Sequence, residues 1–272
     1  MRTQTTMIGN STALAGALER LSSLAAINRP ILVMGERGTG KELAAERLHY
    51  LSARWDAPLV KVNCAAMAES LLESELFGHE AGAFTGATRS QRGRFERADG
   101  GTLFLDELAT MSVRLQEKLL RLVEYGEFER LGGQQTLQVD VRVIAATNVD
   151  LRALARDGRF RADLLDRLSF DVVHLPALRQ RPGDIPELAQ HFAVQLCSEL
   201  GWELFAGFTA QSMARVCNSA SSLIPSLPTV VGFNSTRWRR DRCNHRKRRS
   251  AGCLRSTLSS CARLRNASRC CC

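Results

Sequence analysis

Short apolar runs separated by amphipathic stretches dominate residues 11–175 of the chain. The runs are four to six residues long, which is typical of strands that a parallel sheet buries on both faces. Helical patterns lie between them, and the clearest, at 112–125, puts leucines on one side and charged residues on the other. This alternation predicts an α/β fold with a parallel sheet and right-handed crossovers. The predicted strands are residues 31–34, 59–62, 101–105, 141–146 and 171–175.

A polar, turn-rich segment at 179–184 indicates the end of this layered domain. A helical pattern follows at 185–200. Beyond about Ser212 that pattern ends, while arginine, serine and cysteine accumulate. Such a composition buries too little apolar surface to form a core, which predicts a disordered tail or a shifted reading frame. The predicted organisation is an α/β domain at 1–178, a partial helical domain at 179–211 and a basic tail at 212–272.

The net charge of +9 is unevenly distributed. From Met213 onward there are 13 Lys and Arg against one acid, Asp241, which gives +12, so the preceding residues hold 24 bases and 27 acids, or −3. Two of the nine cysteines, Cys64 and Cys197, lie before this segment, which favours a reduced, cytoplasmic protein over a disulfide scaffold. No apolar run reaches transmembrane length, so no membrane partner is expected.

A glycine-rich turn between the first predicted strand and the helix after it fits a phosphate-binding loop. Backbone N–H groups of such a turn wrap phosphates, the helix N-terminus adds positive potential, and a lysine reaches the terminal phosphates. Glutamate follows Lys41 where a hydroxyl usually binds Mg²⁺, and the alternative is a purely structural glycine turn. The predicted nucleotide-binding residues are Gly35, Glu36, Arg37, Gly38, Thr39, Gly40, Lys41 and Glu42.

Polar side chains at the ends of three predicted strands complete a candidate hydrolytic site. Asp106 would hold Mg²⁺, and Glu107 would orient or deprotonate the attacking water. Asn148 is placed to sense the γ-phosphate or its water, and Asn63 ends the second strand in the same way. The alternatives are a solvated strand end for the two carboxylates and a turn-forming role for each asparagine.

The segment 160–168 predicts a short helix with arginines along one edge. One interpretation pairs Arg161 and Arg167 with Asp163 or Asp166 of the same segment. The other lets both arginines reach the γ-phosphate of a neighbouring subunit and supply positive charge to the transition state, which requires a ring.

A predicted loop of small residues surrounds one aromatic side chain, Phe84. Glycines frame it and free the backbone, so the loop can carry an apolar contact outward when a nucleotide site changes state. The alternative is a turn packed around a core phenylalanine. Farther along the chain, Gly132-Gly133 lies between two extended runs and predicts a hairpin. The candidate partner-binding residues are Gly82, Ala83, Phe84, Thr85, Gly86 and Ala87.

The order of these motifs across residues 8–211 resembles the AAA+ domain of sigma-54-dependent transcriptional activators, to which the Gly82–Ala87 signature is specific. The resemblance implies an AAA+ P-loop NTPase core with a helical lid, and hydrolysis of ATP with Mg²⁺ between the subunits of a hexamer. It implies that the Phe84 loop engages sigma-54 RNA polymerase in the closed promoter complex, with the Gly132-Gly133 hairpin as a second loop. Trp55 would be a docking site for a negative regulator; the alternative is a half-buried tryptophan at the core edge.

Residues 212–272 depart from that family. They match neither the Trp-Pro-Gly-Asn-x-Arg-Glu-Leu motif that ends the family's lid nor its DNA-binding helix-turn-helix. Residues 1–211 are therefore expected to bind ATP weakly, and the chain would be an impaired form of an activator. Two alternatives remain: a different AAA+ remodelling ATPase, and a basic protein that binds nucleic acid through its tail.

Overall fold

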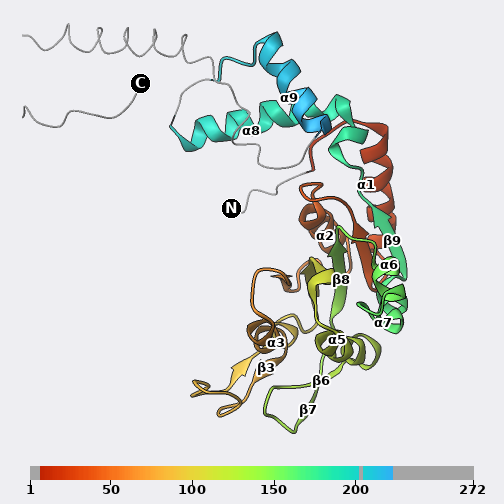
Figure 1. The fold of residues 1–272 in the computed structure, drawn as a ribbon, viewed down its shortest axis with the longest axis vertical. Coiled ribbons are helices and arrows are strands. Elements are labelled where there is room, and N and C mark those ends of the chain that lie inside the picture. The colour runs from red at the N-terminus through yellow and green to blue at the C-terminus, as the bar shows by residue number, and fades with distance from the viewer. Residues whose placement is uncertain (1–6, 202–204, 223–272) are drawn as a thin grey trace, which may run out of the picture. The chain divides into compact units, whose positions relative to one another are not determined.

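The computed structural model describes residues 7–201 and 205–222, so residues 223–272 of the predicted tail at 212–272 lie outside the described residues. Its centre is a five-stranded parallel sheet with the strand order β2-β5-β8-β1-β9 (Figure 1). Each predicted apolar run forms one of these strands, which confirms the α/β fold. The strands are β1 (Ile31–Met34), β2 (Leu59–Asn63), β5 (Thr102–Asp106), β8 (Arg142–Thr147) and β9 (Asp171–His174).

Helices cover both faces of the sheet because successive strand residues point to opposite sides. One apolar cluster joins Leu103 and Leu105 to the helices from α3 to α7, and the other joins Phe104 to α1 and α2. The helices are α1 (Thr12–Ala25), α2 (Lys41–Tyr50), α3 (Glu69–Phe77), α4 (Arg94–Arg97), α5 (Val113–Tyr125), α6 (Leu151–Arg156) and α7 (Ala162–Leu168), with a 3-10 turn, η1, at Leu108–Thr110.

Serine caps fix the starts of two of these helices. Ser11 accepts the N–H of Leu14 at α1, and Ser112 accepts the N–H of Leu115 at α5. The sequence pattern after the glycine-rich turn predicts a helix to about Ala53, but α2 ends at Tyr50 and the following residues form turns.

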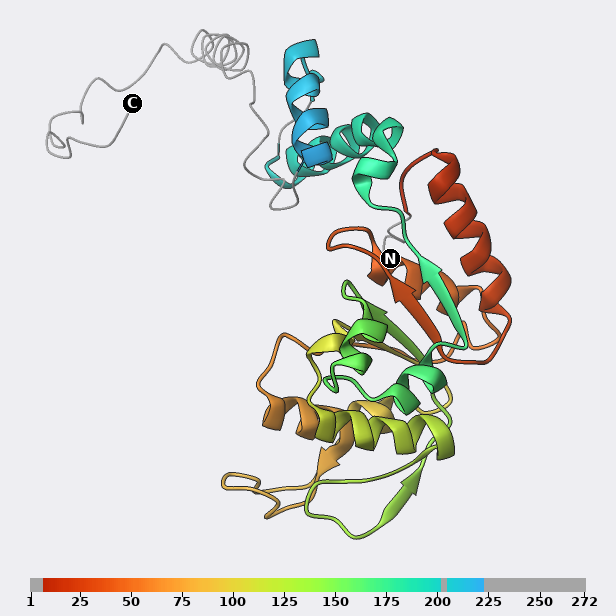
Figure 2. The same ribbon diagram turned by 45° about the vertical axis from the view of Figure 1, so that its right-hand side comes forward.

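Two small antiparallel pairs stand outside the main sheet. β3 (Gly78–His79) pairs with β4 (Gln91–Arg92), and β6 (Glu127–Glu129) pairs with β7 (Thr136–Gln138), which confirms the hairpin predicted around Gly132-Gly133. The loop between β3 and β4 and the loop between β6 and β7 protrude at the same end of the α/β domain (Figure 2).

The helical region after the sheet extends farther than the sequence indicated. Two 3-10 turns, η2 (Leu178–Gln180) and η3 (Pro182–Asp184), lead into α8 (Ile185–Glu199), and α9 (Ala210–Ser222) follows. The expected end of helical structure near Ser212 is thus corrected, since α9 crosses the boundary drawn between 211 and 212. The physical reason is a nonlocal contact, because Val216 of α9 is buried against Ile185 and Ala189 of α8.

Asp184, at the start of α8, ties the helical region to the N-terminal end of α1. Its buried carboxylate accepts the N–H groups of Asn10 and Ser11 at 2.8 and 2.9 Å and the Ser11 hydroxyl at 2.7 Å. Burial alone would raise the pKa of Asp184, but these hydrogen bonds and the nearby Arg181 hold it below its ordinary value of 3.8. The carboxylate is therefore stabilised in its charged form in the folded chain.

Asp184→Ala should lower the free energy of unfolding by about 3 kcal/mol at pH 7, because it leaves three donors without an acceptor and the buried Arg181 without its counter-charge. Urea denaturation followed by circular dichroism measures the change. The folded-state pKa lies below 3.8, so the stabilisation is present at neutral pH and is lost as the pH falls through that pKa. The difference in free energy of unfolding between Asp184→Ala and the unsubstituted chain should therefore become smaller in acid.

Asp163→Ala is the matched control, because Asp163 forms an exposed ion pair worth at most about 1 kcal/mol. Equal losses of stability for the two variants would contradict the role of Asp184.

Candidate functional site

The register of the parallel strands brings the polar strand ends to one edge of the sheet. Asn63 of β2 pairs with Asp106 of β5, and Met34 of β1 pairs with Thr147 of β8. The glycine-rich turn starts at this edge, where the Gly35 N–H donates to the Thr147 carbonyl at 3.1 Å. The carboxyl ends of parallel strands form the usual ligand-binding edge of open α/β sheets.

Glycine is required at several places in the turn at 35–41. A Cβ at Gly35 would approach the Thr39 hydroxyl to 2.6 Å, and Gly38 and Gly40 have φ angles of +77° and +92°. Gly40 precedes α2, whose first N–H groups have no capping side chain and remain available to an anion. The geometry fits a phosphate-binding turn.

Lys41 projects back over this turn from the first residue of α2. Its ammonium donates to the carbonyls of Gly35 and Glu36, each at 3.1 Å, and the side chain is buried. Burial lowers the pKa of Lys41, and the negative charges of Asp106 and Glu107 only partly oppose that shift. A phosphate group bound here would favour the charged ammonium, so the site is suited to an anion.

The two carboxylates follow directly from β5. Asp106 accepts the N–H of Glu107 at 2.9 Å, and Glu107 has a φ of +53°, the one positive value among non-glycine residues in the described part of the chain. The strained backbone turns Glu107 toward the glycine-rich turn, where the Arg37 guanidinium lies 3.6 Å from its carboxylate.

The donor set at this edge fits Mg²⁺ held together with a nucleotide. The described residues contain no group of three or more metal-ligating side chains. Mg²⁺ generally takes one or two carboxylates from the protein and completes its shell with water and substrate phosphates. Asp106 and Glu107 match that pattern.

Four other predicted residues lie around the edge, and three of them have partners of their own. Asn63 accepts the N–H of Ala65 in a turn, and Asn148 is exposed after β8. The carboxylate of Glu42 pairs with Lys61 at 2.8 Å, and that of Glu36 accepts a hydrogen bond from Arg179 at 2.6 Å. Hydrogen bonding to Arg179 lowers the pKa of Glu36.

Arg161 and Arg167 form exposed ion pairs within the chain. Arg161 pairs with Asp163 at 2.7 Å, as one interpretation of the sequence predicted. Arg167 pairs with Glu124 of α5 at 2.6 Å and not with the Asp166 that the same interpretation named as its alternative partner. Water and salt screen exposed pairs of this kind, so either arginine can exchange its partner at small cost.

The Gly82–Ala87 loop exposes its aromatic residue. Phe84 is 47% exposed, which excludes the alternative of a core phenylalanine. Gly82 and Gly86 have positive φ angles, and the Gly82 N–H donates to the Ala87 carbonyl at 2.8 Å to close the base of the loop. The tip therefore stands out from a narrow, closed base.

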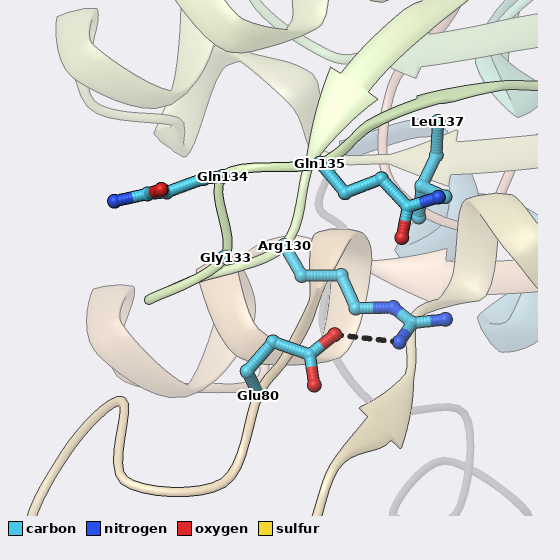
Figure 3. Close-up of a pocket in the computed structure, with 6 residues that line it drawn as sticks. All are labelled: Glu80, Arg130, Gly133, Gln134, Gln135 and Leu137. Carbon is cyan, nitrogen blue, oxygen red and sulfur yellow. Dashed lines mark hydrogen bonds and ion pairs between the residues drawn. The ribbon is translucent and has the colours of Figure 1, made fainter.

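One arginine that sequence patterns did not single out holds the surroundings of this loop. Arg130, directly after β6, donates to the carboxylate of Glu80 at 2.7 Å (Figure 3). It also donates to the carboxylate of Glu96 at 2.6 Å. The Glu96 hydrogen bonds raise the pKa of the Arg130 guanidinium. Glu80, Arg130 and the hairpin also line an open cleft of roughly 320 Å³, in which Gln135 lies near Leu137 (Figure 3).

Trp55 lies apart from the nucleotide edge, after α2. Its side chain is 63% exposed, and Tyr50 and Leu51 nearby in sequence are exposed too. This excludes the alternative of a half-buried tryptophan at the core edge. Exposed aromatic side chains of this size are common in protein interfaces.

Comparison with known proteins decides the family. The model of the sigma-54 interaction domain matches residues 7–174, a segment that contains the glycine-rich turn, both carboxylates and the Phe84 loop. The chain belongs to the sigma-54 interaction domain family. Within this family, the amino-acid sequence of residues 47–55 and 95–109 resembles that of the phage-shock-protein operon activator. In agreement, the chain is 59% identical over 212 residues to the Psp operon transcriptional activator of Escherichia coli.

A second relative is also a transcriptional regulator. The transcriptional regulatory protein ZraR of Salmonella typhimurium is 51% identical over 207 residues, which is 76% of this chain. The chain spans 65% of the Psp operon activator and 47% of ZraR.

Solved structures show the same AAA+ P-loop NTPase fold. Structures of NtrX from Brucella abortus in complex with ADP and with ATP match with TM-scores of 0.73 and 0.69, both at 34% identity. They cover 80% and 79% of this chain, and 48% and 49% of the NtrX chains. No helix in the described part of the domain is long and apolar enough to cross a membrane.

The buried Cys64 offers a test of the site's electrostatics. Burial, followed by the charges of Asp106 and Glu107, raises the pKa of its thiol to about 12. Its alkylation by iodoacetamide at pH 8 should be about a thousandfold slower in the folded chain than in urea, because the thiolate is the reactive form. Mass spectrometry of the labelled peptide measures both rates.

Asp106→Asn should accelerate labelling of Cys64, since it removes one of the charges that raise the thiol pKa. Asp163→Asn, which changes an exposed carboxylate paired with Arg161, should leave the rate unchanged. Labelling at the same rate in folded and unfolded chains would show that Cys64 does not lie in this environment.

Proposed function

We propose that this chain is the ATPase core of an activator of sigma-54 RNA polymerase, which hydrolyses ATP in a ring and remodels the closed promoter complex through the Gly82–Ala87 loop. The observation that carries the proposal is the edge where Lys41, Asp106 and Glu107 meet, joined by α3 to a loop with an exposed aromatic. The ATP and ADP bound to NtrX support the choice of nucleotide.

The chemistry follows from the positions of these side chains. The turn at 35–41 and the N-terminus of α2 would hold the phosphates, with Lys41 at the terminal ones. Asp106 would hold Mg²⁺, which supplies charge neutralisation when bound. Glu107 would orient or deprotonate the attacking water, with Asn63 and Asn148 as polar neighbours at the same edge.

A ring would complete the site from outside the chain. Arg161 and Arg167 are held by surface ion pairs that a more strongly charged phosphate can displace. We assign them to the γ-phosphate of a neighbouring subunit in a hexamer. Trp55 is the assigned contact for a negative regulator, because its exposed ring lies apart from the nucleotide edge.

The predicted weakness of ATP binding stays part of the proposal. The described helical region comprises α8 and α9, and the family's arginine-bearing lid motif has no counterpart at 212–272. The alternative of nucleic-acid binding through the tail falls on residues outside the described ranges.

Lys41→Ala should weaken binding of a fluorescent ATP analogue about tenfold or more, because it removes a buried, charge-assisted phosphate contact. Fluorescence titration measures the Kd. Lys61→Ala is the matched control, since Lys61 of β2 pairs with Glu42 and Glu46 of α2 and should change the Kd less than about twofold. Equal increases in the Kd for the two substitutions would contradict the assignment of Lys41 to the phosphate site.

Phe84→Ala should reduce binding of purified sigma-54 in the presence of ADP–aluminium fluoride about tenfold or more, as truncation of a central aromatic contact does. The ATP Kd should stay within about twofold, because Phe84 lies outside the nucleotide edge. Phe192→Ala, with a similar exposure of 49%, is the control.

Thr85→Ala should weaken the same interaction, since Thr85 adjoins Phe84 at the loop tip. A different AAA+ remodelling ATPase would not need either residue. Full sigma-54 binding by both variants would favour that alternative.

A further inference from the structure

Within the described part of the chain, the partly exposed ring of Phe84 contacts one aromatic neighbour, His79. The ring centroids of Phe84 and His79 lie 4.9 Å apart with an interplanar angle of 61°, an edge-to-face arrangement. The Phe84 side chain is 47% exposed. Hydrogen bonds close the base of the loop, whereas the Phe84 side chain at its tip is held by a ring contact that can be broken without disturbing the core.

His79 itself is held firmly. Its side chain is 8% exposed, and its Nδ1 lies 2.8 Å from the hydroxyl of Ser74, which is also buried. Its backbone pairs with Gln91 in the β3–β4 ribbon. The hydrogen bond to Ser74 and the backbone pairing with Gln91 both hold His79, so its ring forms a rigid support for Phe84.

The loop above this support has room to move. Gly82 and Gly86 have φ angles of +84° and +101°, and a Cβ at either position would meet no atom within 4 Å. On its other side the loop is limited by the hairpin, since a Cβ at Gly132 would approach the Cβ of Ala83 to 2.9 Å. The open side and the two glycines permit the tip to swing away from His79.

The support is also connected to the nucleotide edge. Asn63 ends β2 beside Asp106, α3 follows β2, and Ser74 belongs to α3. Directly after α3 the chain reaches His79 and then the loop. A shift of α3 caused at the strand edge would therefore move Ser74 and His79 together, and with them the surface on which Phe84 rests.

We propose that His79 is a positioning residue that seats Phe84 in the nucleotide-free chain, with Ser74 fixing the orientation of its ring. The proposal rests on the proposed function, in which Phe84 contacts sigma-54. One edge-to-face pair biases the loop toward the seated position by about two- to tenfold. That bias is small enough for nucleotide binding to reverse. The contact between His79 and Phe84, called the seat below, therefore favours one position of the loop without fixing it there.

The seat is tested by ¹⁹F NMR of the full chain labelled with 4-fluorophenylalanine. Loss of one resonance in Phe84→Leu assigns Phe84. His79→Leu should move that resonance toward the value of the free amino acid, and Ser74→Ala should move it part of the way. His79→Phe, which keeps an edge-to-face partner, should leave it near its original position.

His191→Leu is the matched control, because His191 and Phe192 form a similar pair on α8 with centroids 5.5 Å apart. It should move the Phe192 resonance and not that of Phe84. If His79→Leu does not fold, Ser74→Ala and His79→Phe decide the question. An unmoved Phe84 resonance in His79→Leu, or in Ser74→Ala where His79→Leu does not fold, overturns the proposal.

Capture of sigma-54 separates the seat from the proposed function. Without nucleotide, His79→Leu should bind sigma-54 about two- to tenfold better than the unsubstituted chain, and with ADP–aluminium fluoride the two should be nearly equal. Unchanged capture without nucleotide, where the unsubstituted chain does bind sigma-54, contradicts the positioning role. If the ¹⁹F shifts occur but no form captures sigma-54, the seat stands and the proposed function fails.

Discussion

The register of the parallel sheet is the constraint on which the rest of this domain depends. Because β2, β5, β1 and β8 run in the same direction, Asn63, Asp106, Gly35 and Thr147 arrive at one edge. The carboxylates then lie close enough to influence the buried Lys41. An antiparallel strand or a slip of one residue would scatter these groups over two edges or two faces.

The same edge is linked physically to the surface loop that would do the domain's work. Helix α3 connects β2 to His79, and Arg130 clamps the sequences on either side of the loop to the β6–β7 hairpin. The base of the loop is therefore fixed by charge-assisted hydrogen bonds, whereas its tip is placed by one aromatic contact. This division leaves Phe84 as the part that small forces can move.

Local patterns were sufficient to predict the strands of the main sheet, the amphipathic helix α5 and the glycine-rich turn, because apolar periodicity and glycine-dependent backbone angles are properties of short segments. Nonlocal partners were not predictable. Arg167 pairs with Glu124 rather than its neighbour Asp166, and α9 continues past residue 212 because Val216 meets α8. The ion pairs of Arg130 were not predictable either, since Glu96 and Glu80 lie 34 and 50 residues away in the sequence.

Hydrogen exchange of the amides at 80–88, with and without a saturating ATP analogue, tests most directly whether the strand edge controls the loop. If it does, nucleotide should change the exchange of this segment in the unsubstituted chain and leave it unchanged in Lys41→Ala. Identical exchange with and without bound nucleotide in the unsubstituted chain would contradict the coupling between the two sites.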